Sequence, residues 1–235
     1  MPGRTIAIGD IHGCADALAA LIHDMVPAAD DTLIALGDLI DRGPDSQSVI
    51  EQMISLAGRC RLITLQGNHE ELLLSALRDS AAIEKWLRCG GTETLRSYGG
   101  NPDDSHVLAS LIPSSHQEFL ATCRPYYETD THLFVHAGVV AELPIDQQPG
   151  LALRWRVTNA KTAQPHCSGK TLVVGHTPQL SGEVLDLGFL ICIDTHCYRG
   201  GWLTALDVQS GQIWQADRSG RLRPGSDGSH TRTTA

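Results

Sequence analysis

The sequence predicts a single α/β domain, and three observations support that class. A short apolar run followed by a helix-spaced segment occurs three times near the N-terminus, and the second half of the chain contains further short strands. These strands are almost wholly apolar, as strands covered on both faces are. A chain of 235 residues is long enough for one sizeable core, and nothing in its composition requires a second domain.

The three N-terminal units each pair a strand with a helix. A β-rich run predicts the first strand at Thr5–Ile8, and the apolar spacing from Leu18 to Met25 predicts the helix that follows. The same pattern predicts two further units, with strands over 32–36 and 62–65 and helices over 46–56 and 70–77.

The remainder of the chain is less regular. Residues 79–124 show a helical pattern broken by glycine pairs at 90–91 and 99–100, which predicts a helical cap beside the active site. Residues 218–235 contain one leucine among many Gly, Ser, Thr and Arg residues, so we expect a solvated tail after a domain over 1–217. Later strands are expected over 132–135, 172–174, 189–193, 202–208 and 212–215, the last two forming a hairpin.

Charge and cysteine content narrow the classes of function. The formal net charge of −9 argues against a general nucleic-acid binder, because such proteins carry basic patches. Seven cysteines without a C-x-x-C pair argue against a zinc ribbon and against a disulfide framework. The N-terminus enters its first strand without a signal-peptide pattern, and no apolar run approaches the length of a membrane span. We therefore expect a cytoplasmic protein without a membrane partner.

Polar side chains of types that can bind metal ions follow five apolar runs directly. The segments are GDIHG (9–13), GDLIDRG (37–43), GNHE (67–70), FVHAG (134–138) and VVGHT (173–177). Catalytic groups of α/β sheets gather at the carboxyl ends of strands, and a turn needs none of this chemistry to fold. If the chain stays extended after the first strand, the side chains of Asp10 and His12 leave the same face and can bind one ion. Oxygen and imidazole ligands without thiolate suit Mn²⁺, Fe or Zn²⁺.

With these segments in order, the chain resembles the metallophosphoesterases of the phosphoprotein phosphatase family, whose signature is GDxHG, GDxxDRG, GNHE, HAG and GHT. The segments over 86–100 and 191–206 are similar to the small bacterial and phage members, so the resemblance covers residues 4–216. It implies a calcineurin-like fold in which two facing β-sheets are flanked by helices.

The resemblance also implies two divalent metal ions. Asp10 and His12 would hold the first ion, Asp38 would bridge, and the second ion would be held by Asn68, His136 and His176. Manganese is the metal we expect, with iron or zinc as alternatives. Two ions about 3.5 to 4 Å apart can share a hydroxide that attacks phosphorus directly, so no phosphoenzyme is needed.

Two further pairs of residues are assigned roles in catalysis and phosphate binding. His69 follows the ligand Asn68 directly, and we assign it as general acid with Asp41 as its carboxylate partner. Arg42 offers a planar guanidinium to two phosphate oxygens. The family leads us to expect a second phosphate-binding arginine after HAG, and Arg156 is the first choice with Arg154 the alternative. His196 stands where small bacterial members usually have glycine; a surface histidine without a role is the simpler interpretation, and a substrate contact the other.

Several functions compete for this set of residues. The leading hypothesis is a serine/threonine protein phosphatase acting on a phosphorylated protein or a small phosphoester, because Asp41 is present to support His69. The alternative is a symmetrical dinucleoside polyphosphate hydrolase, which resembles this chain but usually lacks that aspartate. A phosphomonoesterase of loose substrate choice would share the same ligands. A silent binding module would be revealed by a missing ligand or acid, and none is missing. The sequence does not specify an oligomeric state.

Overall fold

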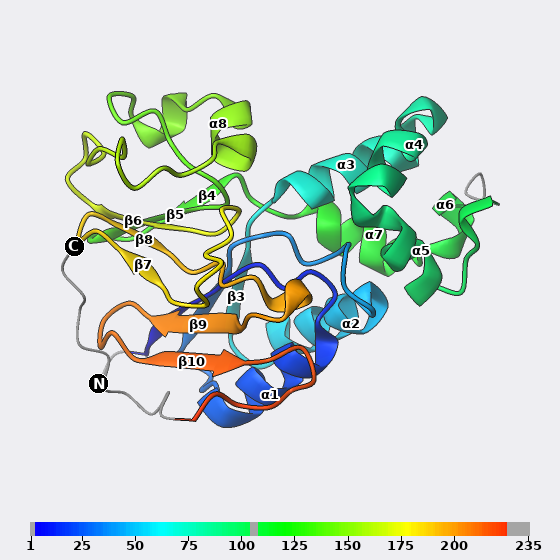
Figure 1. Ribbon diagram of the computed structural model, residues 1–235, viewed down its shortest axis with the longest axis horizontal. Coiled ribbons are helices and arrows are strands. Elements are labelled where there is room, and N and C mark those ends of the chain that lie inside the picture. The colour runs from blue at the N-terminus through cyan, green and yellow to red at the C-terminus, as the bar shows by residue number, and fades with distance from the viewer. Residues whose placement is uncertain (1–2, 104–107, 225–235) are drawn as a thin grey trace.

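The computed structural model describes residues 3–103 and 108–224, in which two five-stranded sheets pack face to face (Figure 1). The first sheet has the order β10-β9-β1-β2-β3, and β1, β2 and β3 run parallel while β9 and β10 are antiparallel to their neighbours. Its strands are β1 (Thr5–Ile8), β2 (Thr32–Ala35), β3 (Arg61–Thr64), β9 (Leu203–Asp207) and β10 (Ile213–Ala216).

The second sheet has the order β4-β5-β6-β8-β7, with three parallel central strands and an antiparallel strand at each edge. Its strands are β4 (Tyr126–Glu128), β5 (His132–Val135), β6 (Thr171–Val174), β7 (Leu185–Asp186) and β8 (Leu190–Cys192). The predicted fold of two facing sheets flanked by helices is therefore confirmed.

Alternation of side chains along the strands explains how the layers form. Ala7 of β1 points between the two sheets and packs with Ile34, Phe134 and Val173, whereas its neighbours in β1 point to the outer face. The outer face of the first sheet is covered by α1 (Ala15–Met25) and α2 (Ser46–Ala57), and α3 (Asn68–Arg78) contributes to the same core. On the outer side of the second sheet, Leu153 of α8 (Gly150–Trp155) is buried in a smaller cluster.

Short helices form most of the chain between α3 and β4, and they project to one side of the sheets (Figure 1). At Gly90 the backbone has φ +113°, a left-handed conformation that suits glycine, and the helical path kinks there. The expectation of a helical segment with glycine breaks describes this region. Its elements are η1 (Ser80–Ala82), α4 (Ile83–Trp86), η2 (Leu87–Gly91), α5 (Thr92–Ser97), α6 (Leu108–Leu111) and α7 (Ser114–Ala121).

The expected tail over 218–235 is wrong in its first part. The backbone N–H of Arg223 donates to the Gln215 carbonyl at 2.8 Å, and its guanidinium donates to the Gln215 side chain and pairs with Glu183. The same guanidinium lies 5.4 Å from the ring centroid of Trp202. These contacts order a stretch too poor in apolar residues to order itself by burial; residues 225–235 lie outside the described part of the chain.

Three elements were not expected from the sequence. They are the edge strands β4 and β7 and the helix α8, which occupies the segment expected to supply the second phosphate-binding arginine. Two single-turn elements, η4 (Ile145–Gln147) and η5 (Cys197–Arg199), complete the described fold. None of the helices within residues 3–103 and 108–224 combines the length and the apolar character needed to cross a membrane.

Candidate metal centre

The polar segments of both sheets converge at the carboxyl ends of their parallel strands. The loop after β1 carries Asp10 and His12, the loop after β2 carries Asp38, and the first turn of α3 carries Asn68 and His69. From the second sheet, His136 follows β5 and His176 follows β6. The two sheets are joined here directly, because the backbone N–H of His176 donates to both carboxylate oxygens of Asp10, at 3.1 and 3.0 Å.

Two histidines, His12 and His136, each direct an unprotonated ring nitrogen toward Asp38. His12 Nδ1 lies 3.0 Å from the Ile40 carbonyl oxygen, and His136 Nδ1 lies 2.9 Å from the Leu36 carbonyl oxygen. A carbonyl can only accept, so both Nδ1 atoms carry the ring hydrogen. Burial lowers the pKa of both imidazoles, that of His136 to about 4, so each ring is neutral at pH 7. The Nε2 atom of each ring therefore carries an unprotonated lone pair.

The lone pair of His136 faces other acceptors, whereas that of His12 lies near an Asp38 oxygen and also near a guanidinium nitrogen of Arg42, which can donate to it. His136 Nε2 lies 3.0 Å from Asn68 Oδ1, 3.4 Å from Asp38 Oδ1 and 3.1 Å from His176 Nδ1. On the opposite side of the same carboxylate, His12 Nε2 lies 3.5 Å from Asp38 Oδ2. Acceptors that converge without a hydrogen between them repel one another, and a cation among them removes that repulsion. The residues therefore fit two divalent ions, one on each side of Asp38.

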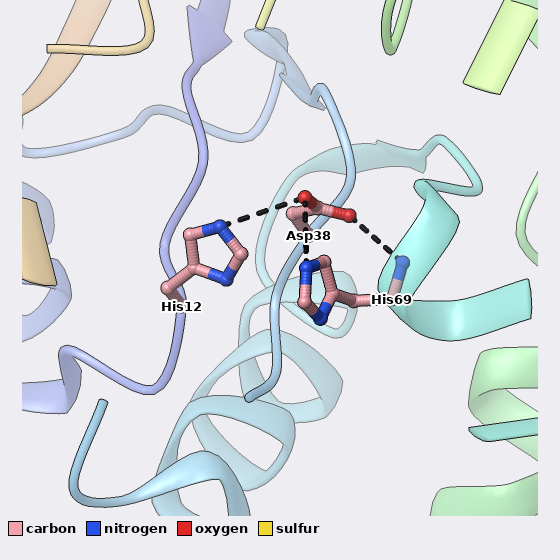
Figure 2. A group of neighbouring side chains, drawn as sticks. All are labelled: His12, Asp38 and His69. Atoms are coloured by element: carbon pink, nitrogen blue, oxygen red, sulfur yellow. Dashed lines mark hydrogen bonds and ion pairs between the residues drawn. The ribbon is translucent and has the colours of Figure 1, made fainter. Parts of the chain in front are cut away.

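Asp38 is the residue common to both groups. Its side chain is grouped with His12 and His69 (Figure 2), and separately with His136 and His176, with the ligand atoms of each group within 4.8 Å of one another. Asp10 belongs to neither group in the described residues, since its carboxylate is turned to the backbone of His176. The shared position of Asp38 is the arrangement expected of a bridging carboxylate.

The electrostatics of the two aspartates differ. Burial alone would raise the pKa of Asp38, but His136, His69 and His12 outweigh it and hold that pKa well below its usual range. Burial, together with repulsion from Asp194 and Asp38, raises the pKa of Asp10. Divalent cations would favour the ionised form of both carboxylates, because a bound ion is the largest local charge in such a site.

The loops that carry these residues adopt strained backbone conformations. Seven non-glycine residues of the described chain have positive φ, and all but Val26 lie in the polar segments at this edge: His12, Asp38, Asp41, Arg42, His176 and His196. Glu70 supports one of these turns, because its carboxylate accepts from the backbone N–H groups of Asp38, Leu39 and Gly67. Strain of this kind is typical of functional sites, where the surrounding structure fixes it.

His69 and Asp41 form a buried pair beside the centre. His69 Nδ1 lies 2.7 Å from Asp41 Oδ2, and neither side chain is exposed to solvent. Burial would lower the pKa of His69, but Asp38 and the bond to Asp41 outweigh it and raise that pKa. His69 Nε2 is the buried side-chain atom of the described residues that has no hydrogen-bond partner, and it lies 3.9 Å from Asp38 Oδ2. A nitrogen held in this way suits either a proton donor or a further metal ligand.

Two side chains of the helical segment donate hydrogen bonds to Asp41. The indole N–H of Trp86 donates to both carboxylate oxygens of Asp41 at 3.1 Å, and the Thr94 hydroxyl donates to one of them at 2.7 Å. Trp86, Thr94 and Asp41 are all fully buried. These contacts attach the predicted cap to the pair. The sequence analysis assigned no role to Trp86 or Thr94 beyond their place in the segment over 86–100.

Arg42 borders an open cavity next to the centre. One of its guanidinium nitrogens lies 3.1 Å from His12 Nε2 and 3.4 Å from the Tyr198 hydroxyl, and its guanidinium carbon lies 5.1 Å from the Tyr198 ring centroid. This orientation suits a group that binds an anion in front of the centre. The cavity is lined by Arg42, Asn68, His69, Arg88, Cys89, Gly90, Glu93, Trp155, Tyr198 and Arg199.

Neither expected second arginine lines that cavity. Arg154 pairs with Glu71, with a nitrogen to oxygen distance of 2.6 Å. Arg156 lines a separate cavity beyond Gly138, against which its aliphatic stem packs. α8 ends at Trp155, so Arg154 lies in its last turn and Arg156 just beyond it; Trp155 lines the cavity and neither arginine does. His196 has φ +65°, which explains why glycine suits this position, and its ring meets Tyr198 edge-on.

Comparison with known proteins agrees with this geometry. The family model described as calcineurin-like phosphoesterase matches residues 3–201. The chain belongs to the calcineurin-like phosphoesterase family. Members of this family are metal-dependent, and the His and Asp groups described above are candidate metal-binding groups in this chain.

The relatives of this calcineurin-like phosphoesterase include two kinds of enzyme. "Serine/threonine-protein phosphatase 1" of Salmonella typhimurium is 29% identical over 212 residues, covering 86% of this chain and 90% of the relative. A symmetrical bis(5'-nucleosyl)-tetraphosphatase of Citrobacter koseri is 44% identical over 261 residues, again covering 86% of this chain and 90% of the relative. A cold-active protein-tyrosine phosphatase from Shewanella shares the fold, with a TM-score of 0.63, 16% identity, and coverage of 95% of this chain and 80% of the other.

Proposed function

We propose that the protein is a metal-dependent phosphoric monoester hydrolase of the serine/threonine protein phosphatase type. The observation that carries the proposal is the buried contact of 2.7 Å between His69 and Asp41. A seryl or threonyl alkoxide is a poor leaving group, so its departure needs a proton. A histidine whose pKa is raised by neighbouring carboxylates can supply that proton near neutral pH.

Six side chains are proposed to hold two divalent ions, with manganese the expected metal. Asp10 and His12 would hold the first ion, Asn68, His136 and His176 the second, and Asp38 would bridge. When bound, such ions lower the pKa of a shared water and stabilise charge on the phosphoryl oxygens. The lone pairs that face one another at Asp38 support this assignment.

The remaining steps belong to side chains of the chain itself. Arg42 is proposed to orient the phosphoryl group through two of its oxygens, since its guanidinium borders the cavity beside His12. His69 Nε2 then donates its proton to the departing oxygen, and Asp41 stabilises the charged imidazole and fixes its ring. Trp86 and Thr94 hold Asp41 through its two oxygens.

A second candidate is the symmetrical hydrolysis of dinucleoside tetraphosphates. The Citrobacter koseri relative, whose name states that activity, is the specific observation that favours it. The leaving group of that reaction is a nucleotide phosphate, which departs readily without a proton. The two activities therefore make different demands on His69.

The test uses this difference in leaving groups. His69→Asn should lower kcat on a phosphoserine peptide by about 10² to 10⁴-fold, the range for loss of general acid catalysis, and Asp41→Asn should follow less severely. Hydrolysis of p-nitrophenyl phosphate should fall only modestly, because p-nitrophenolate leaves without help. Diadenosine tetraphosphate, assayed with the same variants and with Mn²⁺ supplied, shows which substrate class the wild type prefers.

Metal content by elemental analysis is the control for each variant. A variant that retains two equivalents of metal and loses both monoester substrates equally would show that His69 does not act as a proton donor. A His69→Asn variant that loses metal would instead identify His69 as a ligand, as its distance to Asp38 allows.

A further inference from the structure

Two arginines line the cavity beside the centre without a role in the proposed phosphoryl chemistry. Arg42 lies against His12, whereas Arg88 and Arg199 line the same cavity from the helical segment and from η5 after β8. Glu93 is the one acidic residue among the ten that line this cavity. The cavity therefore carries positive charge although the chain as a whole has a net charge of −9.

Arg199 is the last residue of the single turn η5. Its backbone N–H donates to the His196 carbonyl at 3.2 Å, and the next two residues are glycines that close the turn, Gly200 with φ +96°. Its guanidinium carbon lies 5.8 Å from the centroid of the Tyr198 ring, the same ring that Arg42 approaches at 5.1 Å. Both guanidiniums therefore contact the same aromatic ring, and Arg42, Tyr198 and Arg199 all line the one cavity.

Arg88 approaches the cavity from the helical segment. Its side chain is 70% exposed and pairs with Glu84, which is 78% exposed, at 2.8 Å. Ion pairs between exposed groups one helical turn apart are weak, so this pair does not prevent Arg88 from meeting an anion in the cavity. Glu93 lies 3.9 Å from Arg96, which partly offsets its charge.

We propose that Arg199 and Arg88 form a second anion subsite, which selects phosphoesters that carry another anionic group beside the scissile phosphate. The proposal rests on the proposed function for the position of that phosphate, in front of Arg42. In a polypeptide substrate the second group is an acidic side chain or a second phosphoryl group next to the phosphorylated residue. Both present oxygens that a guanidinium binds through paired hydrogen bonds.

The experiment measures competition by peptides that contain a non-hydrolysable phosphonate analogue of phosphoserine, with p-nitrophenyl phosphate as the reporter substrate. One peptide has neutral neighbours, one has adjacent glutamates, one has an adjacent phosphoserine, and one has the same glutamates moved far along the peptide. The variants are Arg199→Gln, Arg88→Gln and the double variant. Arg59→Gln is the matched control, because Arg59 lines a different groove between α1 and α2.

The quantity compared is the ratio of inhibition constants of the neutral and the anionic peptide, measured within each variant so that general changes in activity cancel. We expect the adjacent-anion peptides to bind more tightly by a factor on the order of five for each arginine at moderate salt. The ratio should approach one in the double variant and keep its wild-type value in Arg59→Gln. The glutamate and phosphoserine peptides show which anion the subsite prefers.

Three outcomes would overturn the subsite. They are a wild-type ratio of one, a ratio that survives the double substitution, and equal gains from adjacent and displaced glutamates. Failure of the proposed function is distinguishable, because it appears as tight, flank-dependent competition by peptides whose hydrolysable phosphoserine versions are not turned over.

Discussion

Replacement of Trp86 by phenylalanine tests whether the helical segment contributes to the acid pair. The substitution keeps an aromatic ring at a fully buried position and removes the N–H that donates to both oxygens of Asp41. His69 and Thr94 remain as donors to that carboxylate. A buried charge that loses one of its donors is less well stabilised, so the charged form of the pair is weakened.

The magnitude follows from the geometry. A hydrogen bond to a charged group contributes roughly 1.5 to 3 kcal/mol, and a donor shared between two oxygens at 3.1 Å belongs at the lower end, about 1.5 kcal/mol. That energy corresponds to about a tenfold change. We expect kcat on a phosphoserine peptide to fall about tenfold and kcat on p-nitrophenyl phosphate about twofold or less. The smaller ring should also lower the free energy of unfolding by about 1 to 3 kcal/mol.

Steady-state kinetics on both substrates and urea denaturation are the measurements. Trp214→Phe in β10 is the matched control, since Trp214 is also buried. This substitution should lower stability without changing the ratio of the kcat values for the two substrates. Equal loss on both substrates in Trp86→Phe, which leaves their ratio unchanged, would mean that the indole acts only through packing and would contradict a role in holding Asp41.

Two further predictions concern metal binding and acid stability. Asp38→Ala should lose binuclear metal binding, whereas Asp10→Ala should mainly weaken one ion, because Asp38 is the residue common to both histidine groups in the described part of the chain. Two equivalents of metal in Asp38→Ala by elemental analysis would refute the bridge. Burial would raise the pKa of Asp31, but the side-chain bond to Arg4, the backbone N–H groups of Ala28 and Arg4, and the charge of Arg4 together outweigh burial and lower that pKa. The contribution of Asp31 to stability is therefore present above pH 3.8 and is lost as the pH falls further. The difference in urea midpoint between Asp31→Asn and wild type should therefore shrink below pH 3.8.

The sequence predicted which polar segments meet at one edge of the sheets better than it predicted their surroundings. Asp10, Asp38 and His176 each follow a short apolar strand, and parallel strands end at one edge of a sheet, so local patterns were enough to bring them together. Their roles as ligands stay predictions until metal is measured. The contact of Trp86 with Asp41 spans 45 residues and depends on how a kinked helical segment packs, which no local pattern specifies.

Elements that the sequence did not reveal are short or are ordered by specific bonds. β4 has three residues and β7 has two, and both lie half-buried at sheet edges, so neither produces an apolar run. Arg223 is ordered by hydrogen bonds to Gln215 rather than by burial, which composition does not register. The position of Arg156 depended on where α8 ends, and spacing alone could not choose between it and Arg154.

The direct link between the two sheets has a consequence for folding. Asp10 and His176 are 166 positions apart, and β1 lies between β2 and β9, so the first sheet cannot close until its C-terminal strand is made. Contacts between such distant positions form late, because the long intervening loop must be closed first. During synthesis the N-terminal segments would emerge with their metal-binding side chains well before His136 and His176 exist. Both ions could then bind only after the chain has been synthesised through His176. Metal bound to the native state would oppose separation of the sheets.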